Sequence, residues 1–224
     1  MLKHVAFIVD GNRRWARERK LPAIMGHDSG YRIIESLVKH GKKVGIKYMT
    51  FWVFSTENWN RDPEEVSGLM KLFREILNTD SLDSLIKEGA KISIFGDLSK
   101  FEEDIQKNVV QLIEKTKEND TVYVNFALNY GGRADILQAV NRLLAEKKDQ
   151  VDEKTFSSYL YTSMQPDPDL IIRTGGEQRL SGYLPWQSVY SELYFTPTYW
   201  PDFDEKAFDI ALVEFEKRNR RFGK

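Results

Sequence analysis

The sequence predicts a single α/β domain over residues 1–224, with a mostly parallel central sheet flanked by helices. Short apolar runs typical of buried strands recur along the chain, and stretches of helical periodicity separate them. This alternation is the pattern of parallel strands joined by right-handed crossovers. Each apolar run also ends in polar or glycine-rich sequence, and parallel strands bring such ends to one edge of a sheet. We therefore expect one composite site at the C-terminal ends of the strands.

The candidate strands are short apolar runs, and in chain order they are residues 5–9, 48–54, 91–95, 122–128, 170–172 and a sixth around 188–195. Polar sequence follows the first, second and fifth of them as Asp10-Gly11-Asn12, Ser55-Thr56-Glu57-Asn58 and Arg173-Thr174-Gly175-Gly176-Glu177. Residue 192 of the sixth is a glutamate in an aromatic context.

Helix signals fill the intervals between the strands. Asp62 is an N-cap candidate, Pro63 suits the first helical position, and Glu65 is placed to act as the reciprocal cap. Apolar residues at helical spacing follow over residues 66–77. Ser99 is the expected cap of a later helix, and the spacing predicts further helices around residues 137–144 and 208–215.

Composition excludes several function classes. The 33 basic and 34 acidic residues nearly cancel, so no global positive field favours nucleic acid, and any anion site must be local. The chain contains no cysteine, which excludes disulfides, thiolate metal sites and a cysteine nucleophile. The first residues resemble a strand rather than a secretory leader, and no apolar run approaches the roughly 20 residues of a spanning helix. We expect a cytoplasmic protein, with peripheral contact to a membrane left open.

Asp10 directly follows the first predicted strand and precedes Gly11 and Asn12. It suits an ordinary turn as well as a functional site, since all three are common turn residues. An aspartyl nucleophile of the phosphatase type would need a second Asp two residues later, where Asn12 stands, so that role is disfavoured. A Mg²⁺ ligand fits better, because Mg²⁺ often binds one or two carboxylates and fills its other positions with water and phosphate oxygens.

Five arginines follow or flank the predicted strand ends, namely Arg13, Arg14, Arg61, Arg173 and Arg179. Each one alone is most simply a solvated surface residue, but guanidinium groups gathered at one edge suit bidentate binding of phosphate. The pairs Gly131-Gly132 and Gly175-Gly176 would let backbone N–H groups approach an oxyanion. Neither pair matches a phosphate-loop lysine motif or a dinucleotide fingerprint, so nucleotide binding receives little support.

Three further residues have both an ordinary and a functional interpretation. His27 is most simply a satisfied capping or surface histidine. Trp15 and Trp59 are either core packing, the commoner fate of tryptophan, or walls of a pocket for an apolar ligand. The residues by themselves thus indicate a Mg²⁺–polyphosphate rim beside large apolar helical faces. Such a site would suit an amphiphile such as a prenyl diphosphate.

Six blocks along the chain resemble the cis-prenyltransferase family, most closely the bacterial undecaprenyl diphosphate synthases. They are residues 4–16, 26–27, 54–61, 129–133, 169–177 and 192–195, in the family's order. The trans-prenyltransferase motif opens with two adjacent aspartates, and this chain has no such pair. The resemblance therefore extends over nearly the whole chain and favours the cis branch.

The resemblance implies successive condensation of isopentenyl diphosphate onto an allylic primer, usually farnesyl diphosphate. The expected product is a Z-polyprenyl diphosphate, undecaprenyl diphosphate or a similar lipid carrier for cell wall or glycan biosynthesis, made by a Mg²⁺-dependent homodimer. Asp10 and Asn58 would be catalytic, Asp10 as a metal ligand and Asn58 beside the isopentenyl group. Glu192 would complete the metal site from a dimer partner or a nearby segment. The implied substrate-binding residues are Gly11, Asn12, Arg13, Arg14, Trp15, His27, Ser55, Thr56, Glu57, Trp59, Arg61, Arg173, Arg179, Leu180 and Ser181.

The chain departs from the family pattern at several positions. Ala23 stands where many members carry an arginine, and Arg13, where several bacterial members have glycine, is a candidate to replace that contact. Gln178 and Gly182 stand where bacterial enzymes often have His and Asn. The segment 221–223 resembles a C-terminal element that reaches the partner's site in dimers.

Two other functions remain as alternatives. One is a non-catalytic subunit of a heteromeric prenyltransferase, which the presence of Asp10, Asn58, Arg173 and Glu192 disfavours. The other is a prenyl-diphosphate phosphohydrolase, which would release phosphate without lengthening the chain.

Overall fold

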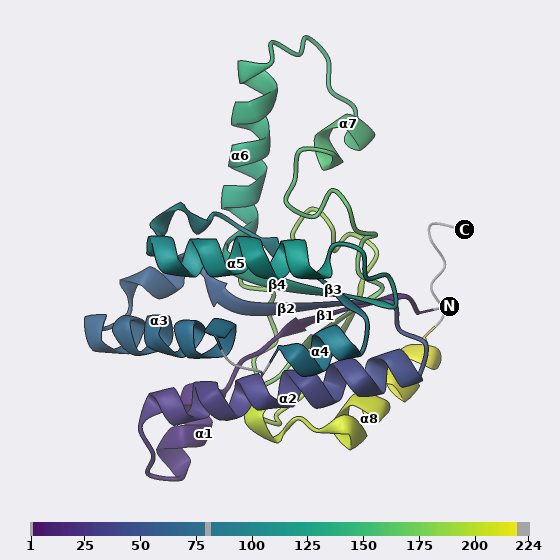
Figure 1. Cartoon of the computed structure of the whole chain (residues 1–224). Helices are drawn as coiled ribbons and strands as arrows, with labels where there is room; N and C mark the ends of the chain where they lie inside the picture. The colour runs from purple at the N-terminus through teal and green to yellow at the C-terminus, as the bar shows by residue number, and fades with distance from the viewer. Residues whose placement is uncertain (1, 79–81, 219–224) are drawn as a thin grey trace.

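Six parallel strands form one sheet in the order β3-β4-β2-β1-β5-β6 (Figure 1). The computed structural model describes residues 2–78 and 82–218. The strands are β1 (His4–Ile8), β2 (Tyr48–Ser55), β3 (Ala90–Phe95), β4 (Val122–Tyr130), β5 (Leu170–Arg173) and β6 (Glu192–Phe195). All six lie where the sequence predicts strands, so the α/β class and the parallel sheet are confirmed.

The helices are α1 (Asn12–Glu18), α2 (Ala23–Lys43), α3 (Pro63–Asn78), α4 (Asp83–Lys87), α5 (Glu103–Thr116), α6 (Gly132–Ala145), α7 (Glu153–Ser157) and α8 (Glu205–Glu216). Three short 3₁₀ turns, η1 (Thr56–Asn60), η2 (Leu98–Lys100) and η3 (Trp200–Asp202), join them. Within the described residues, no helix is both long enough and apolar enough to cross a membrane.

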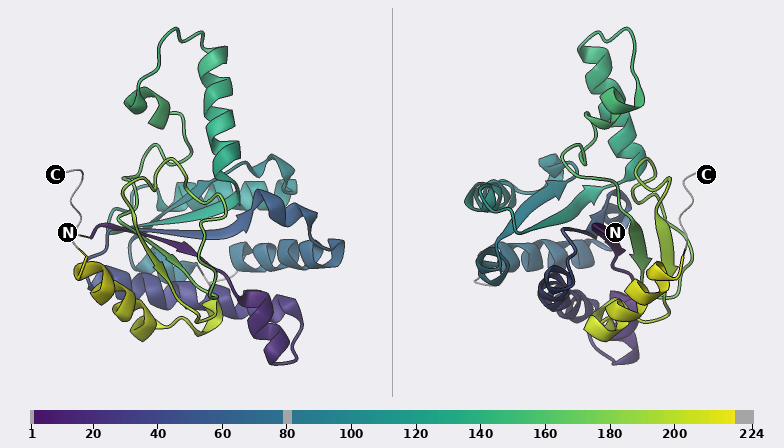
Figure 2. Two further views of the ribbon diagram at one scale, coloured as in Figure 1. Left: turned by 180° about the vertical axis from the view of Figure 1, so that it is seen from behind. Right: turned by 90° about the vertical axis from the view of Figure 1, so that its right-hand side faces the viewer.

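The two faces of the sheet bury different layers. Helices α2, α3, α4, α5 and α8 pack on one face, as the two further views also show (Figure 2). Alternate residues of β1 point to opposite faces: Val5 and Phe7 pack under these helices, whereas Ala6 and Ile8 pack beneath Tyr183 on the other face. The helical layer is the larger one, and its interior contains the apolar cavity described below.

The order of the strands determines where a ligand can bind. From β1 the chain adds β2 and then β3 on one side, places β4 between β2 and β3, and then returns to add β5 and β6 on the other side of β1. The reversal lies between β1 and β5, which are paired so that Ile8 lies opposite Arg173. Open α/β sheets bind ligands outside the carboxyl ends of the strands at such a reversal. Asp10 and Arg173 come from these two strand ends.

One expectation for the helices is wrong in detail. Ser99 does not cap α5, because it lies in η2, where its N–H donates to Asp97; α5 begins at Glu103. The helix predicted around residues 137–144 is confirmed as α6. Helix α6 stands away from the sheet beside α7 (Figures 1 and 2), and Leu137 and Leu144 are exposed.

Candidate functional site

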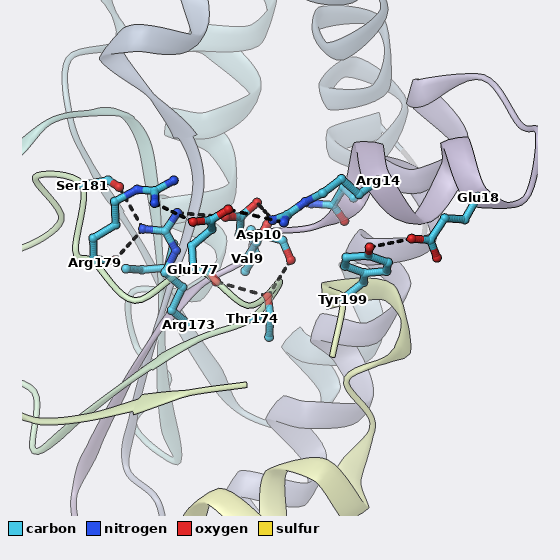
Figure 3. Close-up of polar contacts among 12 residues, drawn as sticks. Val9, Asp10, Arg14, Glu18, Arg173, Thr174, Glu177, Arg179, Ser181 and Tyr199 are labelled. Atoms are coloured by element: carbon cyan, nitrogen blue, oxygen red, sulfur yellow. Dashed lines mark hydrogen bonds and ion pairs between the residues drawn. The ribbon is translucent and has the colours of Figure 1, made fainter. Parts of the chain in front are cut away.

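Asp10 lies between two arginines at the carboxyl ends of β1 and β5 (Figure 3). Its Oδ2 accepts a hydrogen bond from Arg173 Nη2 at 2.8 Å, and its Oδ1 accepts one from Arg14 Nη2 at 3.2 Å. The side chain of Arg173 is 6% exposed and that of Asp10 is 29% exposed. The buried guanidinium therefore has a charged partner, while the carboxylate remains accessible from the pocket.

The backbone around Asp10 is fixed by its neighbours. Its carbonyl accepts hydrogen bonds from Thr174 Oγ1 at 2.7 Å and from Trp200 N at 3.0 Å. Gly11 follows with φ of 106°, a conformation that disfavours any residue with a Cβ, and Tyr199 packs directly against it. This sharp turn lets α1 begin at Asn12, which brings Arg14 back over Asp10 through their i,i+4 spacing.

The segment after β5 extends the charged network. Arg173 Nη1 donates to Ser181 Oγ at 2.8 Å and to the carbonyl of Arg179. Glu177 forms ion pairs with Arg14 and with Arg179 (Figure 3). The arginines of α1 and of this segment are thus held in place by alternating carboxylates.

The end of β2 supplies a second set of polar groups. Asn58 Oδ1 accepts from the backbone N–H of Ser55 at 3.0 Å, and the Ser55 side chain in turn caps the first turn of η1. This reciprocal cap fixes the orientation of Asn58 toward the pocket. Because its oxygen is already bonded to the backbone, Asn58 presents its NH₂ group to a ligand.

Glu65 joins the site, although its sequence position suggested only a helix cap. Its Oε1 accepts from Arg61 Nη1 at 2.9 Å, and its Oε2 lies 3.5 Å from Arg13 Nε. His27 Nε2 lies 3.8 Å from the same carboxylate and, among the described atoms, has no hydrogen-bond partner. Burial, with the positive charges of Arg61 and Arg13, lowers the pKa of His27 to about 4, so its imidazole is neutral near pH 7.

A pocket with about 1670 Å³ of empty space, part of it open solvent, joins these groups, and we call it the cationic pocket. Eleven of the predicted residues line it: Asp10, Gly11, Asn12, Arg13, Arg14, His27, Ser55, Asn58, Arg61, Arg173 and Ser181. Arg17 and Lys20 of the α1 region line it as well and were not anticipated. Among the described residues lining it, Asp10 is the one carboxylate, against five arginines and a lysine.

A second space, with about 530 Å³ of empty volume of which part is open solvent, lies between the sheet and the helices, and we call it the apolar cavity. Its lining side chains come from α2, α3, α5, strands β2 to β4 and the residue before α4, and they are Tyr31, Val53, Phe73, Ile76, Leu77, Leu82, Ile94, Ile105, Val109, Leu112, Phe126 and Leu128. Val53 lines both cavities. The charged pocket and the apolar cavity therefore adjoin at Val53.

Trp15 and Trp59 pack as ordinary structural residues and line neither cavity. Trp15 donates to Asp202, and Arg19 lies over its ring. Trp59 packs on Phe54 and donates to Asn129.

The glycine pairs use backbone N–H groups within the fold. Gly132 N donates to Gly182, Gly175 N to Thr198 and Gly176 N to Thr196. These three donors are therefore not directed at an oxyanion, contrary to the expectation from the sequence.

Four further predicted residues lie outside the lining of the cationic pocket, namely Thr56, Glu57, Arg179 and Leu180. Thr56 donates to Glu57 on η1, and Arg179 and Leu180 belong to the segment that holds Arg173.

Glu192 lies at the start of β6, opposite Leu170 at the start of β5. Asp10 follows the last residue of β1, which pairs with the other edge of β5, so the two carboxylates lie at opposite ends of the sheet. Its carboxylate accepts from Arg218 Nη1 at 3.0 Å. The segment 221–223 lies outside the described residues. Among the residues that are described, no cluster of three or more His, Asp or Glu forms a ready metal site.

Known proteins resemble the chain over nearly its full length. Residues 8–223 match the family model described as undecaprenyl diphosphate synthase. An isoprenyl transferase from Clostridium perfringens is 44% identical, covering 100% of this chain and 90% of the relative. A ditrans,polycis-undecaprenyl-diphosphate synthase, (2E,6E)-farnesyl-diphosphate specific, from Micrococcus luteus is 42% identical, covering 99% and 91%. The crystal structure of lavandulyl diphosphate synthase from Lavandula x intermedia, in complex with dimethylallyl diphosphate, is 34% identical, with a TM-score of 0.95 and coverage of 100% and 98%.

Proposed function

The chain belongs to the undecaprenyl diphosphate synthase family of cis-prenyltransferases, and we propose that its cationic pocket holds the diphosphates of both substrates while its apolar cavity receives the growing chain. The enzyme condenses isopentenyl diphosphate with an allylic diphosphate and forms a cis-polyprenyl diphosphate. The observation that carries the assignment is Val53, which lines both cavities, so the apolar cavity adjoins the charged site. We propose farnesyl diphosphate as the primer, as in the Micrococcus relative's name.

The arginines stabilise the departing diphosphate. Negative charge develops on its oxygens as the allylic bond breaks, and guanidinium donors held in place before the reaction stabilise that charge without reorganising. Arg173 and Arg14 are suited to this task because Asp10 holds both of them. Arg13 and Arg61, held by Glu65, form a second group of donors in the lining of the same pocket.

Asn58 orients the isopentenyl group and does not accept its proton. Its oxygen is bonded to the Ser55 N–H, and an amide nitrogen has no useful basicity. A diphosphate oxygen or a water molecule is the better acceptor. The neutral imidazole of His27 faces the same pocket and can donate or accept one hydrogen bond to an incoming phosphate.

Asp10 fits a Mg²⁺ ion shared with substrate. Mg²⁺ usually keeps several waters and binds one or two carboxylates together with phosphate oxygens. Asp10 is partly exposed to the cationic pocket, and each of its oxygens has a lone pair beyond the one that its arginine occupies. The ion would supply additional positive charge to the leaving diphosphate.

We also propose a homodimer in which Glu192 serves the site of the second copy. Glu192 begins β6 and Asp10 follows the end of β1, so they lie at opposite ends of the sheet with β5 between their strands, and Glu192 cannot complete the metal site of its own chain. Peripheral contact with a membrane, for release of an apolar product, belongs to the same proposal.

The purified chain tests the proposal directly. With farnesyl diphosphate, labelled isopentenyl diphosphate and Mg²⁺, we expect label to enter a lipid-soluble diphosphate, and we expect chelation of the metal to stop incorporation. Release of phosphate without chain growth would instead identify a phosphohydrolase. A chain that incorporates label only with a second protein would be a subunit of a heteromeric enzyme.

A further inference from the structure

Trp52 lines the cationic pocket but not the apolar cavity. It precedes Val53 in β2, and successive residues of a strand point to opposite faces of a sheet. Val53 packs with the helical layer and lines the apolar cavity, whereas Trp52 packs beside Tyr183 on the other face. The cationic pocket therefore meets an apolar side chain of β2 on each face of the sheet.

The indole of Trp52 is held on one face and at its nitrogen. It stacks on the ring of Tyr183, with centroids 4.9 Å apart and planes 10° apart, and its Nε1 donates to the Tyr130 carbonyl at 3.1 Å. Tyr183 is fully buried, so the stack is anchored in the interior. An indole has a single N–H donor and no acceptor, and that donor is already bonded. Trp52 therefore offers apolar carbon surface to the pocket.

One short segment holds this ring beside the charged groups of the pocket. Ser181 Oγ accepts from Arg173 Nη1 at 2.8 Å, and two residues later Tyr183 stacks on Trp52. In the sheet, Ile8 lies between Trp52 of β2 and Arg173 of β5, and residues in register on parallel strands point to the same face. Donors for a diphosphate and a flat apolar ring thus share one face of the sheet.

The two substrates differ in the apolar surface that they need. The allylic substrate carries the growing chain, which the proposed function places in the apolar cavity on the helical face. The isopentenyl substrate carries one short branched group, and an aromatic ring supplies a large apolar contact for such a group. Among the described residues that line the cationic pocket, Ile8 and Trp52 are the apolar side chains that pack on the face away from the apolar cavity.

We propose that the isopentenyl group of the second substrate lies against the ring of Trp52 while Arg173 and Ser181 hold its diphosphate. The proposal rests on the function given above and adds a substrate-binding residue to it. Asn58, which lines the same pocket, orients the same group. A group held against a fixed ring presents its double bond to the allylic carbon in a defined orientation, which the condensation requires.

The experiment is steady-state kinetics of the purified chain, with each substrate varied in turn. Trp52→Ala should raise the KM for isopentenyl diphosphate about 10- to 50-fold, from the apolar contact that is lost. The KM for farnesyl diphosphate should change by less than about threefold, because its chain binds on the other face. Inorganic diphosphate carries the charge without the isopentenyl group, so its inhibition constant should also stay within about threefold of the wild-type value.

Two further variants test whether the ring itself makes the contact. Trp52→Phe keeps a ring that can stack on Tyr183 but loses the hydrogen bond to Tyr130, so we expect a KM for isopentenyl diphosphate close to the wild-type value. Trp186→Ala is the matched control, because Trp186 also packs on an aromatic ring and donates its N–H, to Ser157 Oγ at 3.0 Å, but lines neither cavity. It should leave both KM values unchanged.

The outcomes separate the inference from the function on which it rests. An unchanged KM for isopentenyl diphosphate in a Trp52→Ala protein that melts cooperatively overturns the inference and leaves the transferase intact. Equal rises in both KM values, or in the inhibition constant of inorganic diphosphate, overturn it as well, because they indicate a general distortion of the pocket. A rise in Trp52→Phe as large as that in Trp52→Ala removes the contact from the ring. If Trp52→Ala does not melt cooperatively, Trp52→Leu, which keeps more apolar bulk, is judged by the same criteria. If the wild-type chain incorporates no label, the proposed function fails, and the inference fails with it.

Discussion

Replacing Asp10 with alanine should nearly abolish turnover while diphosphate binding is kept or tightened. The carboxylate now occupies Arg173 Nη2 at 2.8 Å and Arg14 Nη2 at 3.2 Å, so its removal frees two guanidinium groups for phosphate. Loss of one preorganised electrostatic group typically lowers kcat about 100- to 1000-fold. Asp10 would also hold the Mg²⁺, so we expect a decrease at or beyond the upper end of that range.

The same substitution should leave the protein folded. Arg173 is buried and loses a charged partner, and breaking a fully buried pair costs about 3–5 kcal/mol. Asp10 is 29% exposed, so the expected cost is lower, on the order of 1–3 kcal/mol, within the stability of a typical domain.

The assay measures turnover and binding on the same preparation. Label incorporation gives kcat, and titration calorimetry with a non-hydrolysable thiodiphosphate analogue of the primer gives Kd. Asp104→Ala is the control, because Asp104 also pairs with an arginine, Arg74, but neither residue lines either cavity. Turnover within tenfold of wild type in Asp10→Ala would refute the catalytic role. A parallel loss of binding and turnover would refute the separation of the two.

Two predictions concern stability. Burial lowers the pKa of His4 and of His27 to about 4, whereas both side chains have a pKa near 6.5 in the unfolded chain. Because the unfolded chain binds these protons first, the free energy of unfolding should fall as pH drops from about 6.5 to 4. The loss should approach about 3 kcal/mol per histidine, measured from urea unfolding midpoints across that pH range. His4→Gln should make the free energy of unfolding depend less steeply on pH. Identical urea midpoints at pH 6.5 and pH 4 would contradict this prediction. In Gly26→Ala the new Cβ would lie 2.1 Å from the Asn12 carbonyl oxygen, so the melting temperature should drop by several degrees. Gly68→Ala, with its nearest neighbour at 3.6 Å, should be neutral or stabilising, and equal melting of the two variants would refute the clash.

The sheet could be predicted from the sequence because each strand is a short apolar run bounded by polar residues. The run before Asp10 is buried on both faces, which only a central parallel strand requires, and β1 is that strand. The neighbours of β1 could not be predicted in the same way. Alternation of strands and helices gives the direction of the crossovers but not the order of strands, and it is the pairing of β1 with β5 that brings Asp10 to Arg173.

The site residues that the sequence did not predict correctly share one physical cause, which is that their partners are set by tertiary structure and not by local spacing. Glu65 fits the pattern of a helix cap, and local spacing cannot show that Arg61 and Arg13 would compete for its carboxylate. The N–H groups of Gly175 and Gly132 suited an oxyanion only while their distant backbone acceptors were unknown. Arg17 carried a faint signal, since it follows Arg13 and Arg14 at helical spacing on α1, whereas Lys20 lies beyond the end of that helix.

Charge balance explains why the arginines stay in position before any substrate binds. Five guanidinium groups and an ammonium group around one pocket would repel one another strongly if they were unpaired. Asp10 is shared by Arg14 and Arg173, and Glu65 is shared by Arg61 and Arg13. A diphosphate therefore binds by replacing carboxylate contacts, so its affinity is the difference between two sets of ion pairs. Asp10 is anchored through its backbone to Thr174 and Trp200 and therefore remains beside the leaving group during the exchange. Its side chain is also the more exposed of the two carboxylates, at 29% against 13% for Glu65, which is the structural reason to place the chemistry at Asp10.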